Sequence, residues 1–568
     1  MTSLSLFQLL PTHIVELIVK HIRVSDNHGR DKVKHQQLLW VCDNFRTVVY
    51  SLYNRRYELN ISDPACKADA TCNTKQCPWV LCRYYNGYTS YDLAKDLSIH
   101  VELGCIYSGK ALEMLSRAPY KDCVFPLVRR ISFACDMTQT EDLDVYALFS
   151  HDNIAAFVQK LRQMAPGAHE LNLADYTCVS WPESTVGYFG SLVNQILQYT
   201  SRFKNSLVGY RPPVALDFDG IRSLAHIDYA LDSNRELCFQ LARQCASTLQ
   251  YLRLWSTINK YEEYLDLSRL IRGDDGICVE YSCLQKLILD NDLTMLQRPV
   301  LGTFVAFPAL RHLSIANEYP FGDDTLFRGN SETLEYLRMC IHTSTSIILR
   351  ECGVFTHSSH PKLRYVVTPG TSGFSADPVA TNAEYMRFVL SIGSNVAARV
   401  INGQSYDRNI PCLLQLLGEH KSMQILTLHG LRFSLLDTIS LIKSLPLLSD
   451  LRTGPPKLDS HLTDIPKAQL IETLSDSHAP MGRRFRLWGI GVCSQPMDEV
   501  VECVMLLALL CPFFDRVDIP SDLVEAYEGC VKDCVAAPPF NQHEQRLQRL
   551  LAWERQSVIT ADEKCPLY

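Results

Sequence analysis

Leu249 to Leu254 read LQYLRL, with leucines at the first, fourth and sixth places. Side chains two residues apart share one face of a β-strand, so this spacing predicts a short strand with one buried face. The apolar-x-x-apolar-x-apolar pattern recurs, as VRRISF at 128–133, AHELNL at 168–173, LQKLILDN at 284–291, LRHLSIAN at 310–317, LEYLRMC at 334–340, LRYVV at 363–367, MQILTL at 423–428 and LSDLRT at 448–453.

The copies follow one another at fairly regular steps. From Leu252 to Leu287, Leu313, Leu337 and Val366 the steps are 35, 26, 24 and 29 residues. A period of roughly 20 to 29 residues is typical of leucine-rich repeats, and these copies resemble that family. A repeat of this kind is open above and below, so it must stack on its neighbours.

Helical patterns lie between the predicted strands, for example IAAFVQKLRQM at 154–164 and LLDTISLIKSL at 435–445. Alternation of strand and helix along a repeat array predicts an α/β solenoid, with parallel strands inside and helices outside. The array is irregular early on, since the steps from Ile131 to Leu171 and on to Leu252 are 40 and 81 residues. The core of an ordinary α/β protein is the alternative interpretation.

The first fifty residues carry a different pattern. LLPTHIVELIVKHI at 9–22 has apolar residues at the i, i+4 spacing of one helix face, with Pro11 in the first turn, where proline is accepted. LLWVCDNFRTVVYSLY at 38–53 has a second helical pattern. The sequence therefore predicts a small helical module ahead of the repeats.

Together these two stretches resemble the F-box, over roughly residues 8 to 56. The resemblance implies a substrate-recognition subunit of a Skp-cullin-F-box ubiquitin ligase, which docks a Skp-type adaptor and thereby the cullin complex. The residues implied in docking are Leu10, Pro11, Ile14, Ile18, Leu39, Val41, Cys42, Phe45 and Val48. The alternative is an interaction scaffold without a ubiquitin role, whose N-terminal helices cap the repeats.

The expected organisation has four parts. Residues 1–57 form the F-box-like helical module, 58–125 a linker or irregular cysteine-containing segment, 126–535 the irregular leucine-rich-repeat-like solenoid, and 536–568 a C-terminal helix and tail. Strand positions between the buried leucines should point away from the helices and bind an unknown target protein. These candidates are Arg253, Ile288, Ser314, Arg338 and Thr427.

Composition and charge argue against nucleic-acid binding and membrane insertion. The chain has 568 residues, 47% of them hydrophobic, and a formal net charge of −7, so we expect a folded protein that binds no nucleic acid. The longest apolar run, CVMLLALLCPFF at 503–514, is well short of the roughly 20 residues needed to span a bilayer. We therefore expect a cytoplasmic or nuclear protein with no membrane partner.

Cysteine is abundant, with 22 residues, and Cys66, Cys72, Cys77 and Cys82 form a weak candidate for a zinc site. Their spacing lacks the C-x₂₋₄-C knuckle of structural zinc sites, which favours buried or loop thiols and no metal. Phosphate-binding, dinucleotide-binding, hydrolase and metalloprotease motifs are absent from the sequence. We expect neither a cofactor nor an enzymatic activity.

Overall fold

A computed structural model describes the parts of the chain that carry the repeats. The described residues are 11, 14–15, 18, 56–61, 95–117, 120–136, 151–173, 183–206, 218, 220–231, 235–255, 268–273, 275–290, 304–318, 327, 329–340, 360–368, 396–402, 410–429, 433–453, 456–458, 462, 465–466, 469–472, 485–488, 496–510, 514–518, 524–536 and 540. The chain divides into two compact units, Met1–Leu293 and Thr294–Tyr568.

The first unit contains a parallel sheet whose strands pair in chain order. Its strands are β1 Arg56–Ile61, β2 Asp96–Glu102, β3 Arg130–Asp136, β4 Glu170–Leu173, β5 Arg202–Asn205, β6 His226–Ala230, β7 Tyr251–Trp255 and β8 Lys286–Asp290. Its helices are α5 Leu103–Tyr107, α6 Lys110–Leu115, α7 His151–Met164, α8 Glu183–Leu197, α9 Arg235–Gln244 and α10 Ser268–Ile271.

The second unit repeats this organisation, again with parallel strands paired in chain order. Its strands are β9 His312–Glu318, β10 Tyr336–Cys340, β11 Tyr365–Thr368, β12 Ala398–Asn402, β13 Ile425–His429, β14 Asp450–Arg452, β15 Phe485–Trp488 and β16 Phe514–Asp518. Its helices are α13 Ile410–Leu417, α14 Leu435–Ser444, α16 Met497–Leu510 and α17 Val524–Ala536.

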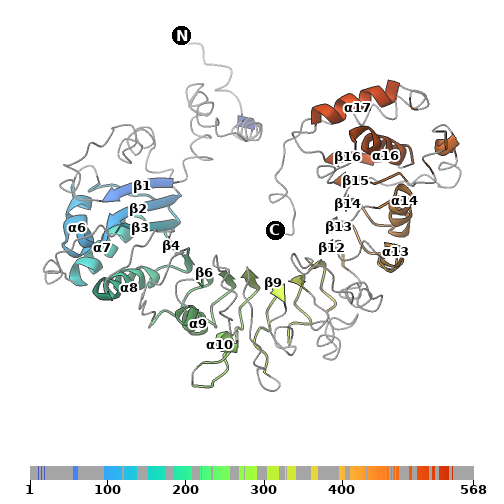
Figure 1. Ribbon diagram of the computed structural model, residues 1–568. Helices are drawn as coiled ribbons and strands as arrows, with labels where there is room; N and C mark the ends of the chain where they lie inside the picture. The colour runs from blue at the N-terminus through green and yellow to red at the C-terminus, as the bar shows by residue number, and fades with distance from the viewer. Residues whose placement is uncertain are drawn as a thin grey trace, which may run out of the picture. The chain divides into compact units, whose positions relative to one another are not determined.

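In each unit the repeat helices lie along one face of the sheet (Figure 1). The strands turn their leucines towards these helices. In the first unit one register row is buried throughout β2–β8, formed by Leu97, Ile131, Leu171, Phe203, Ile227, Leu252 and Leu287. Burial of each such side chain contributes about 1.5–3 kcal/mol, so this row is a main source of cohesion between repeats. The predicted α/β leucine-rich-repeat-like solenoid is confirmed.

The helices bury the faces that their sequence patterns predict. In α7 the buried side chains are Ile154, Phe157, Val158, Leu161 and Met164, an apolar stripe of helical period. Helix α14 begins after Ser434, whose hydroxyl accepts a hydrogen bond of 3.1 Å from the backbone N–H of Asp437. This N-cap satisfies one of the free N–H groups of the first turn.

Neighbouring repeats are also joined by threonine hydroxyls. The stretches STLQYLRL and ETLEYLRM place Thr248 and Thr333 at the same position ahead of β7 and β10. Their Oγ1 atoms lie 3.0 Å from the carbonyl of Leu224 and 2.9 Å from that of Leu310, in the preceding repeats. Each hydroxyl thus fixes the spacing between two successive turns of the array.

The sheet begins earlier than the sequence predicts. Strands β1 and β2 pair with each other, and β2 pairs with β3. The expected start of the solenoid at residue 126 is therefore too late, and the segment 58–125 is not simply a linker. The pattern is incomplete at β1, where Asn54 takes the first apolar place. AKDLSI at 94–99 has the same pattern as AHELNL and would have pointed to β2.

Other predictions lie outside the described residues. They are the second N-terminal helix at 38–53, the four cysteines from Cys66 to Cys82 and the C-terminal helix after residue 540. Among the described residues, no helix combines the length and apolar character needed to cross a membrane.

Candidate functional site

The predicted target-binding residues fall into one register row in each unit. Arg253 pairs with Ile288 across β7 and β8. In the second unit Ser314 pairs with Arg338, and the row continues through Val367 and Val400 to Thr427. These rows alternate with the buried leucines, so they lie on the face of the sheet away from the helices, here called the open face.

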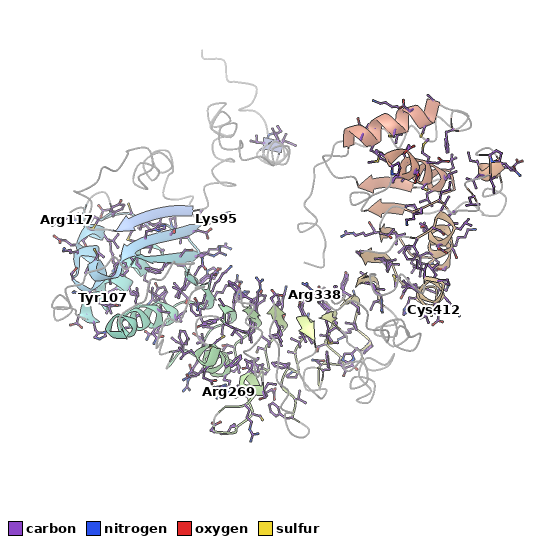
Figure 2. All side chains as sticks on the ribbon, in the orientation of Figure 1. Lys95, Tyr107, Arg117, Arg269, Arg338 and Cys412 are labelled. Carbon is purple, nitrogen blue, oxygen red and sulfur yellow. The ribbon has the colours of Figure 1, made fainter. Side chains whose placement is uncertain are left out.

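Position on the open face does not guarantee exposure. Figure 2 shows Arg338 on the strand side of its unit and Arg269 on the helix side of its own. Ser314 and Thr427, however, are buried. Their side chains are short, and Ser314 stands beside the longer Arg338 in the same row. The expectation that these two residues offer a binding surface is therefore wrong, whereas Arg253, Ile288 and Arg338 stay partly exposed.

The open face of β5–β8 carries a cluster of charged, aromatic and apolar side chains, which we call the β5–β8 patch. It consists of Arg202, Lys204, His226, Asp228, Tyr251, Arg253, Trp255, Lys286, Ile288 and Asp290. Strand register alone brings them together, since the four strands present these residues at matching positions.

Arg253 is the centre of the ionic contacts in this patch. Its Nε and Nη2 atoms donate to the same oxygen of Asp290, at 2.8 and 2.7 Å. Its Nη1 lies 3.9 Å from Asp228, which also has Lys204 Nζ at 3.8 Å. Arg253 on β7 thus links a carboxylate from each of the two strands that flank its own, β6 and β8.

The carboxylates are more covered than the cations. The side chains of Asp228 and Asp290 are 12% and 20% exposed, against 41% for Lys204 and 38% for Arg253. Trp255 contributes to this cover, because its Nε1 donates a 2.8 Å hydrogen bond to Asp228. The patch therefore turns its positive groups outward.

Stacked aromatic rings lie between these charged side chains. The rings of His226 and Tyr251 stack with centroids 3.8 Å apart and an interplanar angle of 9°. Lys286 Nζ lies 5.7 Å from the centroid of the Tyr251 ring, within cation–π range. The second unit has a similar stack between His312 and Tyr336, with centroids 3.9 Å apart.

Burial and neighbouring charges set the protonation states in the patch. Burial, helped by Arg202, lowers the pKa of His226 to about 4, so this ring is neutral at pH 7. Burial and Asp228 raise the pKa of Tyr251 to about 12. Burial also lowers the pKa of Lys286, and Arg253 adds to this effect.

For Arg253, burial alone would lower the pKa, but Asp290 and Asp228 outweigh it and the pKa is raised. The guanidinium is therefore a permanent cation at any pH of interest. Sequence reasoning found Arg253 and Ile288 but missed the rest of the patch. LAHIDYA at 224–230 does carry the pattern, with Leu224, Ile227 and Tyr229 at its apolar places, and would have pointed to Asp228.

The N-terminal docking residues are described only in part. The backbone N–H groups of Ile14 and Val15 donate to the carbonyl of Pro11, at 2.9 and 3.2 Å, as at the start of a helix. Pro11 is exposed and Ile14 and Ile18 are partly exposed, while Val15 is buried. The remaining candidates, Leu10, Leu39, Val41, Cys42, Phe45 and Val48, lie outside the described residues.

Within the described part of the chain, no group of three or more His, Cys, Asp or Glu side chains is arranged to hold a metal ion. The cysteines Cys238 and Cys245 are buried, and burial raises the pKa of both thiols. A raised pKa keeps a thiol protonated and unreactive.

Comparison with known proteins adds likenesses of fold. No protein-family model and no curated protein matches the sequence. Among solved structures, 75% of this chain is similar to 49% of TLR13 in its complex with ssRNA13, at 11% identity and a TM-score of 0.35, so the chain spans about half the length of that protein. Similar matches are the leucine-rich-repeat protein LegL7 from Legionella pneumophila (75% of this chain, 90% of that chain, 11% identity, TM-score 0.22) and the yeast Rad7 and Elc1 complex (80% of this chain, 94% of that chain, 14% identity, TM-score 0.25).

Proposed function

We propose that this chain is a non-catalytic substrate-recognition subunit of a Skp-cullin-F-box ubiquitin ligase. Its N-terminal module docks a Skp-type adaptor, and the open face of its repeats binds a target protein. The observation that carries target binding is the β5–β8 patch, where cations and aromatic rings remain accessible on a rigid sheet. Residues held on strands keep their geometry, which favours recognition.

Adaptor docking is supported by the F-box-like sequence at 8–56 and by the surface of its first helix. Ile14 and Ile18 are four residues apart, so they share one helix face, and both keep part of their surface exposed. Apolar side chains on one face of a helix are the anchors of helix-in-groove recognition. We propose that this face contributes to the adaptor interface.

Co-expression of the full chain with a tagged Skp-type adaptor tests this proposal. The wild-type chain should co-purify with the adaptor, and the double variant Ile14→Asp/Ile18→Asp should lose at least about tenfold in affinity, because charges replace two apolar anchors of the proposed interface. The matched control is Ile277→Asp/Leu447→Asp, which makes the same chemical change at exposed aliphatic residues elsewhere. The control should retain the adaptor.

The alternative is an interaction scaffold without a ubiquitin role, with the N-terminal helices acting as a cap. In that case the wild-type chain would not bind the adaptor, and Ile14→Asp/Ile18→Asp would lower the thermal stability of the repeats instead. Adaptor binding that survives in this variant would equally refute the proposed docking face.

A further inference from the structure

The β5–β8 patch carries more positive charge than the chain around it. Among the described side chains on this open face are four cations, Arg202, Lys204, Arg253 and Lys286, and two carboxylates, Asp228 and Asp290. The whole chain has a formal net charge of −7. A net-positive patch on an acidic protein is a local feature of the surface and does not follow from composition.

Among the described residues, two of the four cations form ion pairs with carboxylates and two do not. Arg253 is held by Asp290 and Asp228, and Lys204 approaches Asp228. No ion pair joins Arg202 or Lys286 to another described residue, and Lys286 Nζ lies 5.7 Å from the centroid of the Tyr251 ring. These two side chains stand at the same register position of β5 and β8, at either end of the His226–Tyr251 stack.

The spacing of these cations suits an extended chain. Adjacent strands lie about 4.8 Å apart, so Arg202 and Lys286, three strands apart, are separated by about 14 Å. An extended peptide rises about 3.3 Å per residue, so its side chains at i and i+4 are about 13 Å apart and on the same side. Acidic side chains with that spacing can reach both cations, while the peptide segment between them lies over the stacked rings of His226 and Tyr251.

We propose that the β5–β8 patch binds an extended acidic segment of a partner protein, with carboxylates four residues apart on Arg202 and Lys286. The inference rests on the proposed function, since it names the chemistry of the target that the open face takes. Lys204 and Arg253, in the next row of the same strands, add to the positive potential along the segment. The neutral ring of His226 and the Tyr251 ring supply a flat surface for its backbone and apolar atoms.

Fluorescence anisotropy with the full chain tests the proposal. The probe is a labelled ten-residue peptide with Glu at every second position, compared with the same peptide carrying Gln in place of Glu. We expect the Glu peptide to bind at least about tenfold more tightly, and its affinity to fall as salt is raised, because screening weakens contacts between exposed charges. Equal affinity for the two peptides, or no binding of the Glu peptide, would overturn the proposal.

The variant Lys204→Gln/Lys286→Gln removes two cations and keeps Arg253 with its carboxylates. It should weaken binding of the Glu peptide about fivefold to tenfold, while a melting curve shows that it stays folded. Lys362→Gln/Lys532→Gln is the matched control, because these exposed lysines lie outside the patch and the net charge changes equally. The control should change affinity less than about twofold.

Two further outcomes separate this inference from its rivals. A labelled single-stranded DNA ten-mer that binds the patch more tightly than the Glu peptide would contradict a protein target. A version of the peptide with phosphoserine in place of Glu should bind at least as well as the Glu peptide, because the patch recognises negative charge. Co-purification of the Skp-type adaptor should be unaffected by Lys204→Gln/Lys286→Gln, so failure of this inference and failure of adaptor docking are distinguishable.

Discussion

At the scale of single residues, two histidines are held neutral by the fold. His226 lies in the β5–β8 patch, with Arg202, Glu170 and Lys286 around it, and His360 is buried against the edge of the Phe327 ring. Burial is the main cause in both cases, and it lowers each pKa to about 4. An unfolded chain would bind protons at these residues near pH 6.5.

This difference predicts that acid destabilises the protein through these two residues. Between pH 6.5 and 4 the unfolded state binds more protons than the folded state, so the free energy of unfolding falls as pH is lowered. We expect a loss of about 1 kcal/mol for each histidine between pH 7 and pH 5, after allowance for partial solvent exposure. Urea denaturation followed by circular dichroism at both pH values measures it.

The control is the double variant His226→Gln/His360→Gln, which cannot take up these protons. Its loss of stability between pH 7 and pH 5 should be about 2 kcal/mol smaller than that of the wild type, since carboxylates titrate alike in both proteins. Parallel pH dependence in the two proteins would show that the histidines are not held neutral.

At the scale of elements, what the sequence could predict depended on the apolar pattern of each strand. Strands such as β7, β8 and β10 carry leucine or a similar residue at every patterned place and were predicted. Strand β5 was missed because Thr200 and Asn205 take two of those places. Strand β12 was missed because Arg399 stands, fully buried, in register with Val366 and Leu426. Neighbouring repeats impose the strand where the local sequence does not specify it.

The threonines near these strands give opposite predictions for the same substitution. Thr248→Val should lower the free energy of unfolding by about 1 kcal/mol, because its hydroxyl bonds to carbonyls of the preceding repeat. The buried hydroxyl of Thr200 has no hydrogen-bond partner among the described residues, so Thr200→Val should be neutral or stabilising by up to about 1 kcal/mol. Chemical denaturation of both variants checks the signs.

Thr248→Ser, which keeps the hydroxyl, is the control for the first variant and should retain most of the stability. If Thr200→Val loses as much stability as Thr248→Val, the hydrogen bond of Thr248 to the preceding repeat is not what stabilises the array. The contrast would then have no hydrogen-bonding cause.

At the scale of the whole chain, the sequence predicted a parallel repeat array and a separate N-terminal module. Alternation of side chains along strands also placed Arg253 and Ile288 on the open face, although the network around Arg253 required the register of β5, β6 and β8. That register follows from the stacking of consecutive repeats, which no single motif contains. We propose that the N-terminal module docks the adaptor and that the open face of the repeats binds the target.

Hydrogen–deuterium exchange of the full chain, with and without a Skp-type adaptor, tests this division of roles most directly. We expect slower exchange at 9–22 and 38–53 when the adaptor is present, and unchanged exchange in β5–β8. Protection of β5–β8 with no change at 9–22 and 38–53, or no protection anywhere in the chain, would contradict it.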